Sequence, residues 1–319
     1  MMKRTKQLKN TMTKLLAAAL MVAMLPVTAY ADTVKEPLND AMDLATYYTN
    51  YNGVDFTKEQ YDRLMEYYSE DEIDIMQPEF AEPLFENLYD FTVEQQSIYV
   101  QTLESVDEDG NVITTEKETV LTEEQAKYMD KLEVDAFPAI SRESSQTHET
   151  ASKIITLKFN SFGGSTRGIV LSCSWKKLPV TRSYDIMAIA PSNSIHFNTP
   201  SAFSASQVTD AGTTRYSMNS SGVNIDSKGI GISMNLYNDA TKSIVCTMEC
   251  VLASTVEPFV VYGTYQHCQS DISQSDSKKY SIEVSSANMG GILKFSNSSI
   301  ASKYDNTQGL KISGTLENH

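Results

Sequence analysis

The charge and the hydrophobic pattern of this chain both change near residue 150. From Asp32 to Thr150 the sequence has 7 basic and 30 acidic residues, whereas from Ala151 to His319 it has 14 basic and 11 acidic ones. At the same place the spacing of apolar residues changes from about 3.6, the helical period, to about 2, the period of strands. We therefore predict an acidic domain over residues 32–145 and a second domain over residues 151–319, with a polar link at 141–150 between them.

Three capping boxes predict helices in the acidic domain. In each, a Thr or Ser is followed three residues later by Gln or Glu, so that each side chain can bond the other residue's backbone N–H. The boxes are Thr57 with Gln60, Ser69 with Glu72 and Thr122 with Gln125, and the helices they predict run from Lys58 to about Tyr68, from Ser69 to before Pro78, and from Thr122 to about Leu132. Apolar residues at helical spacing from Leu38 to Tyr48 indicate a further helix.

One β-hairpin interrupts this helical pattern. Two β-rich arms, 98–106 and 112–120, flank an acidic turn that contains Gly110 and Asn111. The turn partly matches a calcium-binding loop, but Ser105 stands where that loop needs its first carboxylate, and the arms alternate like strands. The sequence therefore predicts a hairpin turn here and no metal site.

From Lys153 onward, short β-branched runs are separated by Gly, Ser, Asn and Pro. No helical stretch is long enough to serve as a crossover, which favours an antiparallel β-sandwich of the jelly-roll kind. The fold class is thus α+β, a mostly helical domain with one hairpin followed by this sandwich. The expected strands span 154–159, 169–175, 184–189, 213–218, 229–237, 243–252, 259–268, 280–284 and 292–295.

All four cysteines lie on these expected strands. Cys246 and Cys250 share one strand, where about 13 Å would separate their Cα atoms, too far for a disulfide. Cys246 and Cys268 lie on consecutive strands, so a bridge between them is the most natural one if any forms. Four buried free thiols are the alternative.

No complete catalytic or cofactor-binding motif occurs in the chain. His148 begins a partial zinc-protease pattern in which Ser152 replaces the second histidine. The stretch 163–167 lacks the second glycine of a nucleophile elbow, and there is no glycine-rich phosphate loop. We therefore predict no cofactor and no metal. A hydrolase with two carboxylates that meet only in space stays open as an alternative.

Residues 1–31 have the order of a secretory signal peptide. Five basic residues precede an apolar run from Leu15 to Leu25, and Ala29-Tyr30-Ala31 has the small residues that signal peptidase requires. The run is far shorter than the roughly 20 apolar residues that span a bilayer. We expect cleavage after Ala31, a secreted extracellular protein and no membrane span after cleavage. No lipid-anchoring cysteine follows the run, so we expect release or non-covalent retention at the surface.

The segment from Ser174 to Asp185 contains the only tryptophan and a cluster of basic residues. It is expected to form a strand end, a turn fixed by proline, and the start of the next strand. One interpretation is a basic, aromatic loop at the rim of the sandwich that binds an anionic polymer or the acidic domain. The other is structural, with the indole covering the core and an Arg182–Asp185 pair. The candidate ligand-binding residues are Trp175, Lys176, Lys177, Arg182, Tyr184 and Asp185.

This segment reads Trp-Lys-Lys-x-Pro-x-x-Arg-Ser-Tyr-Asp over residues 175–185. Together with the capped helix from Lys58, it resembles exported proteins of Gram-positive bacteria that carry such a stretch before a β-rich C-terminal region. The resemblance implies an exported bacterial protein and implies nothing about mechanism.

We therefore expect a secreted, non-catalytic binding protein of a bacterial cell surface or its surroundings, with a cell-wall or host glycan or protein as partner. The acidic half argues against nucleic acid and anionic lipid, because like charges repel. It either keeps the protein soluble or docks a basic partner. A membrane-active β-protein is a third hypothesis, since Ile230, Ile232, Met234 and Leu236 alternate with polar or small residues. The oligomeric state does not follow from the sequence.

Overall fold

Two antiparallel β-sheets pack face to face in the part of the chain that this computed structural model describes. The described residues are 45–107, 109–130, 147–161, 166–192, 201–253, 259–284 and 292–314. The expected signal peptide lies outside them and stays a prediction. Most of the expected helix from Leu38, and residues 141–146 of the expected link, also lie outside the described residues.

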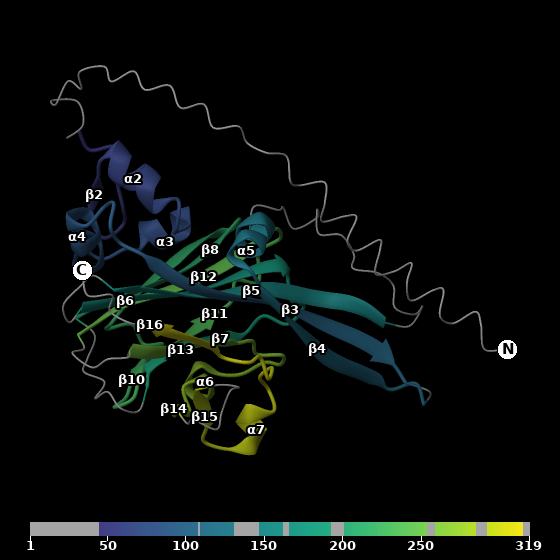
Figure 1. Cartoon of the computed structure of the whole chain (residues 1–319). Helices are drawn as coiled ribbons and strands as arrows, with labels where there is room; N and C mark the ends of the chain where they lie inside the picture. Colours follow the sequence, from purple (N-terminus) through teal and green to yellow (C-terminus); the bar gives the residue numbers. More distant parts are fainter. Residues whose placement is uncertain are drawn as a thin grey trace, which may run out of the picture. The chain divides into compact units, whose positions relative to one another are not determined.

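Within these residues the larger sheet has seven strands in the order β4-β3-β5-β6-β12-β8-β9 (Figure 1). Every neighbouring pair is antiparallel. Figure 1 shows the β3–β4 hairpin, with β5 beside it, extending beyond the other strands of this sheet. The bounds are β3 (Val93–Val106), β4 (Val112–Leu121), β5 (Thr147–Ser161), β6 (Thr166–Lys177), β8 (Ala202–Thr209), β9 (Gly212–Ser217) and β12 (Ile244–Ala253).

The smaller sheet has five described strands in the order β10-β11-β7-β13-β16, and they too are antiparallel. Two further pairs, β1 with β2 and β14 with β15, form short two-stranded sheets. The bounds are β7 (Tyr184–Pro191), β10 (Val223–Ile225), β11 (Ile230–Asn235), β13 (Phe259–Gln266), β16 (Leu310–Gly314), β1 (Tyr48–Thr49), β2 (Asp55–Phe56), β14 (Tyr280–Ile282) and β15 (Leu293–Phe295).

The main core lies between the two sheets. Alternate residues of each strand point inward, so that apolar side chains of both sheets meet in one buried cluster. The sheets approach closely at Gly263 of β13, where a β-carbon would lie only 2.9 Å from Leu157 Cδ1. The close packing of the sheets at this point therefore depends on the absence of a side chain at Gly263.

A helical cap, which we define as residues 48–91, covers one end of the outer face of the larger sheet (Figure 1). Its apolar side chains, such as Phe56 and Phe80, pack on Val170 and Val251 of the sheet. It contains α2 (Lys58–Leu64), α3 (Glu70–Asp74) and α4 (Pro78–Glu86), while α5 (Glu123–Asp130) follows β4. A third cluster joins the outer face of the smaller sheet to α7 (Ser298–Ala301), β14 and β15, and α6 (Gln274–Ser277) lies next to β7 and β11.

The three predicted capping boxes are present. The Thr57 and Ser69 side chains each accept a hydrogen bond from the N3 backbone N–H, and the N3 side chain accepts one from the N-cap backbone N–H. Thr122 and Gln125 bond each other's backbone in the same way, at 3.2 and 2.9 Å. The helix α2 ends earlier than expected, however, and Tyr48 belongs to a strand. The helix α4 was not predicted, because Pro83 lies inside it.

The antiparallel β-rich architecture expected for residues 151–319 is confirmed, and each expected strand is found at least in part. The strands β8, β10 and β16 were not predicted. The hairpin forms as expected, but β3 pairs with β5 along almost its whole length. This pairing differs from the expected grouping of the hairpin with the helical half. The reason is that β3 buries an apolar face, including Ile98 and Val100, in the sandwich core.

Candidate functional site

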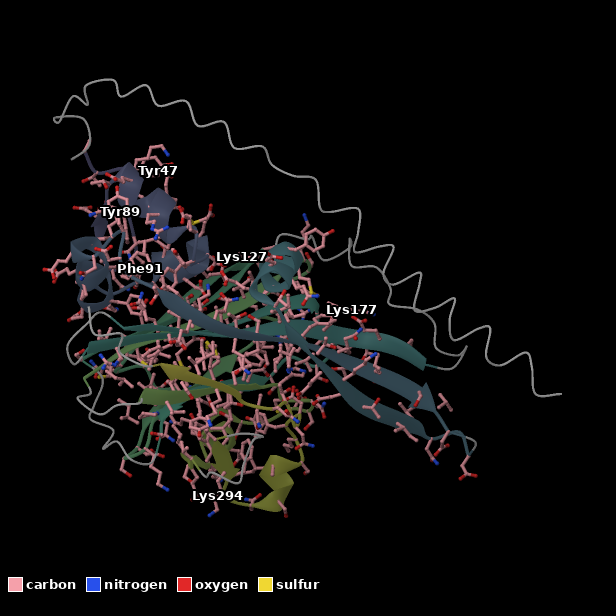
Figure 2. All side chains as sticks on the ribbon, viewed as in Figure 1. Tyr47, Tyr89, Phe91, Lys127, Lys177 and Lys294 are labelled. Atoms are coloured by element: carbon pink, nitrogen blue, oxygen red, sulfur yellow. The ribbon has the colours of Figure 1, made fainter. Side chains whose placement is uncertain are left out.

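A half-open cleft of about 560 Å³ lies on the outer face of the larger sheet. Residues 65–72, which connect α2 to α3 and begin α3, form one wall. Ala126 and Lys127 of α5 form the opposite wall, and Figure 2 labels Lys127 there. Side chains of β3, β5, β6 and β12 form the floor.

Hydroxyl side chains cross this face of the sheet in one row. Ser97, Thr156, Ser172, Thr247 and Ser206 stand directly opposite one another on β3, β5, β6, β12 and β8. Directly opposite residues of antiparallel strands point to the same face, so all five hydroxyls face outward from the core. Ser97 Oγ and Thr156 Oγ1 are 2.9 Å apart. Thr156 and Ser172 line the cleft, which therefore has a floor suited to hydrogen bonding.

A buried ion pair forms part of the lining of the cleft. Lys158 of β5 contacts the carboxylate of Glu72, and its Nζ lies 5.3 Å from the centre of the Tyr68 ring. The same Glu72 carboxylate accepts from the Ser69 backbone N–H at 2.8 Å, so it completes the capping box of α3 as well. Nearby, Glu249 accepts from the Gln77 N–H at 2.9 Å, and burial raises the pKa of its carboxyl well above its usual range.

The rim of the cleft is acidic and partly aromatic. Glu66 and Glu70 are exposed, and Asp71 is half-buried. Lys127 on the opposite wall is paired with Glu123 at 2.8 Å. The half-buried ring of Tyr67 stands in the wall, 5.2 Å from the Phe91 ring. The cleft thus offers acceptors and negative charge at its rim, with one aromatic face.

Three tyrosines in or directly before the helical cap are exposed but do not line the cleft. Tyr47, Tyr51 and Tyr89 are 56%, 61% and 67% exposed. Figure 2 labels Tyr47 and Tyr89. The guanidinium of Arg215 lies 4.4 Å from the centre of the Tyr51 ring, so that ring already has a cationic neighbour.

Trp175 lies in the core and not on a surface loop. It is only 2% exposed, and its Nε1 donates to Tyr265 Oη at 3.0 Å. Tyr265 Oη in turn donates to Asp185 at 2.5 Å, and His267 Nδ1 lies 3.0 Å from the same carboxylate. The structure therefore brings Trp175 and Asp185 into one buried network, which agrees with the structural interpretation of the indole and not with the alternative of a surface recognition loop.

The other candidate residues of this segment are not gathered at one surface. Arg182 donates to the carbonyl oxygens of Tyr237 and Asn238, at 3.1 and 2.8 Å, and not to Asp185. Lys176 is buried, whereas Lys177 is exposed and donates to the Glu149 carbonyl. The half-buried Tyr184 receives a bond at its carbonyl oxygen from Tyr304 Oη, at 2.9 Å. These bonds fix the turn and the adjoining strands.

All four cysteines are buried free thiols. The bridge considered between Cys246 and Cys268 is absent because Cys246 lies in β12 of the larger sheet, whereas Cys268 follows β13 of the smaller one. β12 and β13 are consecutive in sequence but do not pair. Cys246 instead stands directly opposite Cys173.

The alternation that suggested a pore-forming strand has a structural cause. Ile230, Ile232 and Met234 of β11, with Leu236 beyond it, point into the sandwich core and are at most 1% exposed. In the described part of the chain, no helix has the length and apolar character needed to cross a bilayer.

The cleft residues were not predicted as a site. Their one signal in the sequence is the pair of serines at alternate positions, Ser172 and Ser174, in a strand whose other face is apolar. The polar face of any half-exposed strand shows the same pattern. Only the placement of α3 and α5 over that face makes it a cleft.

No protein-family model matches this chain, and no curated protein sequence matches it either. Among solved structures, it is similar to the collagen-binding domain of the Erysipelothrix rhusiopathiae surface protein RspB, with 10% identity and a TM-score of 0.26 over 70% of this chain and 56% of that chain. It is also similar to the Corynebacterium diphtheriae major pilin SpaA, with 6% identity and a TM-score of 0.18 over 53% of this chain and 57% of that chain. The matched parts are little more than half of each structure's length. Neither likeness is close enough to carry an argument about function.

Proposed function

We propose that this chain is a secreted, non-catalytic binding protein that holds an amine-bearing glycan of a bacterial or host surface in the cleft between the helical cap and α5. The observation that carries the proposal is the union of a hydroxyl-lined floor with an acidic rim in one half-open cleft. Sugar hydroxyls would bond the floor, whereas protonated amines would be attracted to the rim carboxylates.

Three kinds of side chain support this choice of ligand. Thr156 and Ser172 can each donate and accept a hydrogen bond, as sugar recognition requires. Glu70 faces water, where it can meet a cation without a large desolvation cost, whereas Glu66 is already paired with Arg63. Tyr67 supplies an aromatic wall on which the apolar face of a sugar ring can rest. An anionic polymer would be repelled by this rim.

Calorimetric titration with two oligosaccharides of equal length tests the proposal. The cationic probe is an oligomer of glucosamine, and the matched neutral probe is the corresponding N-acetylated oligomer. We expect the glucosamine oligomer to bind and its affinity to fall as salt is added, because the rim charges are screened. We expect weaker binding of the neutral oligomer.

Variants then locate the site. Glu70→Gln combined with Tyr67→Ala should weaken binding by a factor of about 10 or more, since a charged contact and an aromatic wall are both lost. Tyr89→Ala, which changes an exposed tyrosine outside the cleft, should bind as the wild type does. No binding of either probe, or equal loss in both variants, would contradict the proposal. Shortening of the oligosaccharide during the titration would show a hydrolase instead.

A further inference from the structure

Lys153 and Asp305 form a deeply buried ion pair between the two sheets. Lys153 lies in β5 of the larger sheet, and Asp305 lies five residues before β16 of the smaller one. Their side chains are 3% and 1% exposed, and Lys153 Nζ contacts Asp305 Oδ2. Removing two charges from water to this degree has a large desolvation cost. This cost offsets much of the attraction between the charges, so the ion pair alone adds little to the stability of the contact between the sheets.

The Asp305 carboxyl is held in one orientation by backbone bonds. Its Oδ1 accepts from the His267 backbone N–H at 3.0 Å, and the Asp305 N–H donates to the His267 carbonyl at 2.9 Å. One carboxyl oxygen therefore accepts a hydrogen bond from an amide N–H, while the other contacts the amine. A donor on Oδ1 withdraws electrons from the carboxyl carbon and would stabilise negative charge that develops on that oxygen.

Aromatic rings enclose the amine. The centres of the Trp175 and Tyr265 rings lie 5.1 and 5.2 Å from Lys153 Nζ. Both rings are buried, and Trp175 Nε1 is bonded to Tyr265 Oη. These rings exclude water from the pair and fix the direction from which the amine reaches the carboxyl.

A third titratable group, Glu116 of β4, accepts a hydrogen bond from the backbone of Asn306, the residue after Asp305. It is half-buried, and Gln269 Nε2 lies 3.4 Å from its Oε1. Burial, followed by the charge of Asp305, raises the pKa of Glu116 to about 7, while Lys153 acts in the opposite direction. Glu116 is thus able to carry a proton near neutral pH, next to an amine and a carboxyl in contact.

We propose that Lys153 and Asp305 react after folding to form an intramolecular isopeptide bond, with Glu116 as the proton carrier. Proton transfer within the ion pair first gives a neutral amine and a neutral carboxylic acid. Lys153 Nζ then attacks Asp305 Cγ, and the Nζ–Cγ bond forms as the negative charge collects on Oδ1 against the His267 N–H. Glu116 takes a proton from the nitrogen and returns it to Oδ2. The Cγ–Oδ2 bond breaks, one water leaves, and no oxidant, reductant or other reactant is needed.

A second buried lysine gives a matched comparison. Lys158, also in β5, contacts Glu72, and their side chains are 10% and 2% exposed. There both the amine and the Ser69 N–H fall on the same carboxylate oxygen, Oε2. The backbone donor therefore competes with the amine and does not polarise the opposite oxygen. We expect this pair to stay ionic.

Mass spectrometry of the purified, naturally processed full-length chain, denatured after its N-terminus has been determined, tests the proposal. We expect a mass lower than the sequence mass by one water, about 18 Da, and a cross-linked proteolytic peptide that joins Lys153 to Asp305. A mass equal to the sequence mass would overturn the proposal. So would a cross-link at any other pair.

Variants separate the roles. Lys153→Arg and Asp305→Ala should restore the full sequence mass, whereas Lys158→Arg should keep the deficit. Glu116→Gln should leave most of the freshly folded chain unlinked. A mass deficit that persists in Lys153→Arg would contradict the assignment. So would a Lys158→Arg variant that has its full sequence mass and no cross-link at Lys153. Because the wild-type peptide map identifies the bond directly, the test stands even if a variant fails to fold.

Discussion

At the scale of single residues, Trp175 and Asp185 contribute to the fold from a segment whose sequence also suggested binding. Both are buried and joined through Tyr265 Oη. In sequence, an aromatic residue beside lysines resembles a recognition loop. The reason is that the pattern of residues at the end of a strand does not show which side chains face the core. The neighbouring Lys153 and Asp305, which complete this network, are far from it in the sequence.

Glu116 predicts a pH dependence of stability. Its pKa in the folded protein is raised to about 7 by burial and by Asp305, with Glu118 adding to the rise and Lys153 opposing it. Its unfolded value is about 4.3. The folded state therefore binds this proton more tightly, so its stabilising effect is full below about pH 4.3 and is lost as the pH rises through 7.

The test uses Lys153→Arg, in which no isopeptide bond can form and a positive charge stays beside Asp305. We expect its melting temperature to fall between pH 5 and pH 8 more steeply than that of Lys153→Arg combined with Glu116→Gln, and thermal unfolding at both pH values measures this difference. Lys153→Arg combined with Glu118→Gln is the control and should keep most of the slope of Lys153→Arg. Equal slopes with and without Glu116→Gln would show that Glu116 has an ordinary pKa.

At the scale of elements, the helices began where their capping residues predicted. Thr57 is the N-cap of α2, and its Oγ1 accepts from the Gln60 N–H at 3.2 Å. Replacement by Ala removes this acceptor and should lower the free energy of unfolding by about 1 kcal/mol. Thr57→Ser keeps the hydroxyl and should lose much less. Denaturant unfolding measures both, and an equal loss in the two variants would rule out the cap as the cause.

Local signals explain what the sequence could predict. Capping boxes and alternation involve residues close in the chain, and they located α2, α3, α5 and most strands. Strand partners are not local. That β3 joins β5, and that the strands carrying Cys246 and Cys268 belong to different sheets, depends on contacts across the whole fold. The cleft and the Lys153–Asp305 pair were not predicted for the same reason.

At the scale of the whole molecule, the helical cap and the sandwich share their packing. Val170 and Val251 of the larger sheet belong to the same buried cluster as Phe56 and Phe80 of the cap. A cap that buries its apolar side on the sheet should not unfold independently of it.

We therefore expect one cooperative unfolding transition. The fluorescence of Trp175, the only tryptophan, reports on the sandwich core, and far-ultraviolet circular dichroism reports on both helices and strands. The two signals should change at the same denaturant concentration. An early loss of helical signal, with Trp175 fluorescence unchanged, would show that the cap unfolds first.

The position of the Lys153–Asp305 pair has a mechanical consequence. The two residues are 152 positions apart, so a covalent bond between them closes a loop that contains most strands of the sandwich. A force applied to the two ends of such a chain would be transmitted through the bond and not through that loop. Roughly 500 Å of extended chain would then never be released. Only the segments outside residues 153–305, which include the helical cap, could extend under the force.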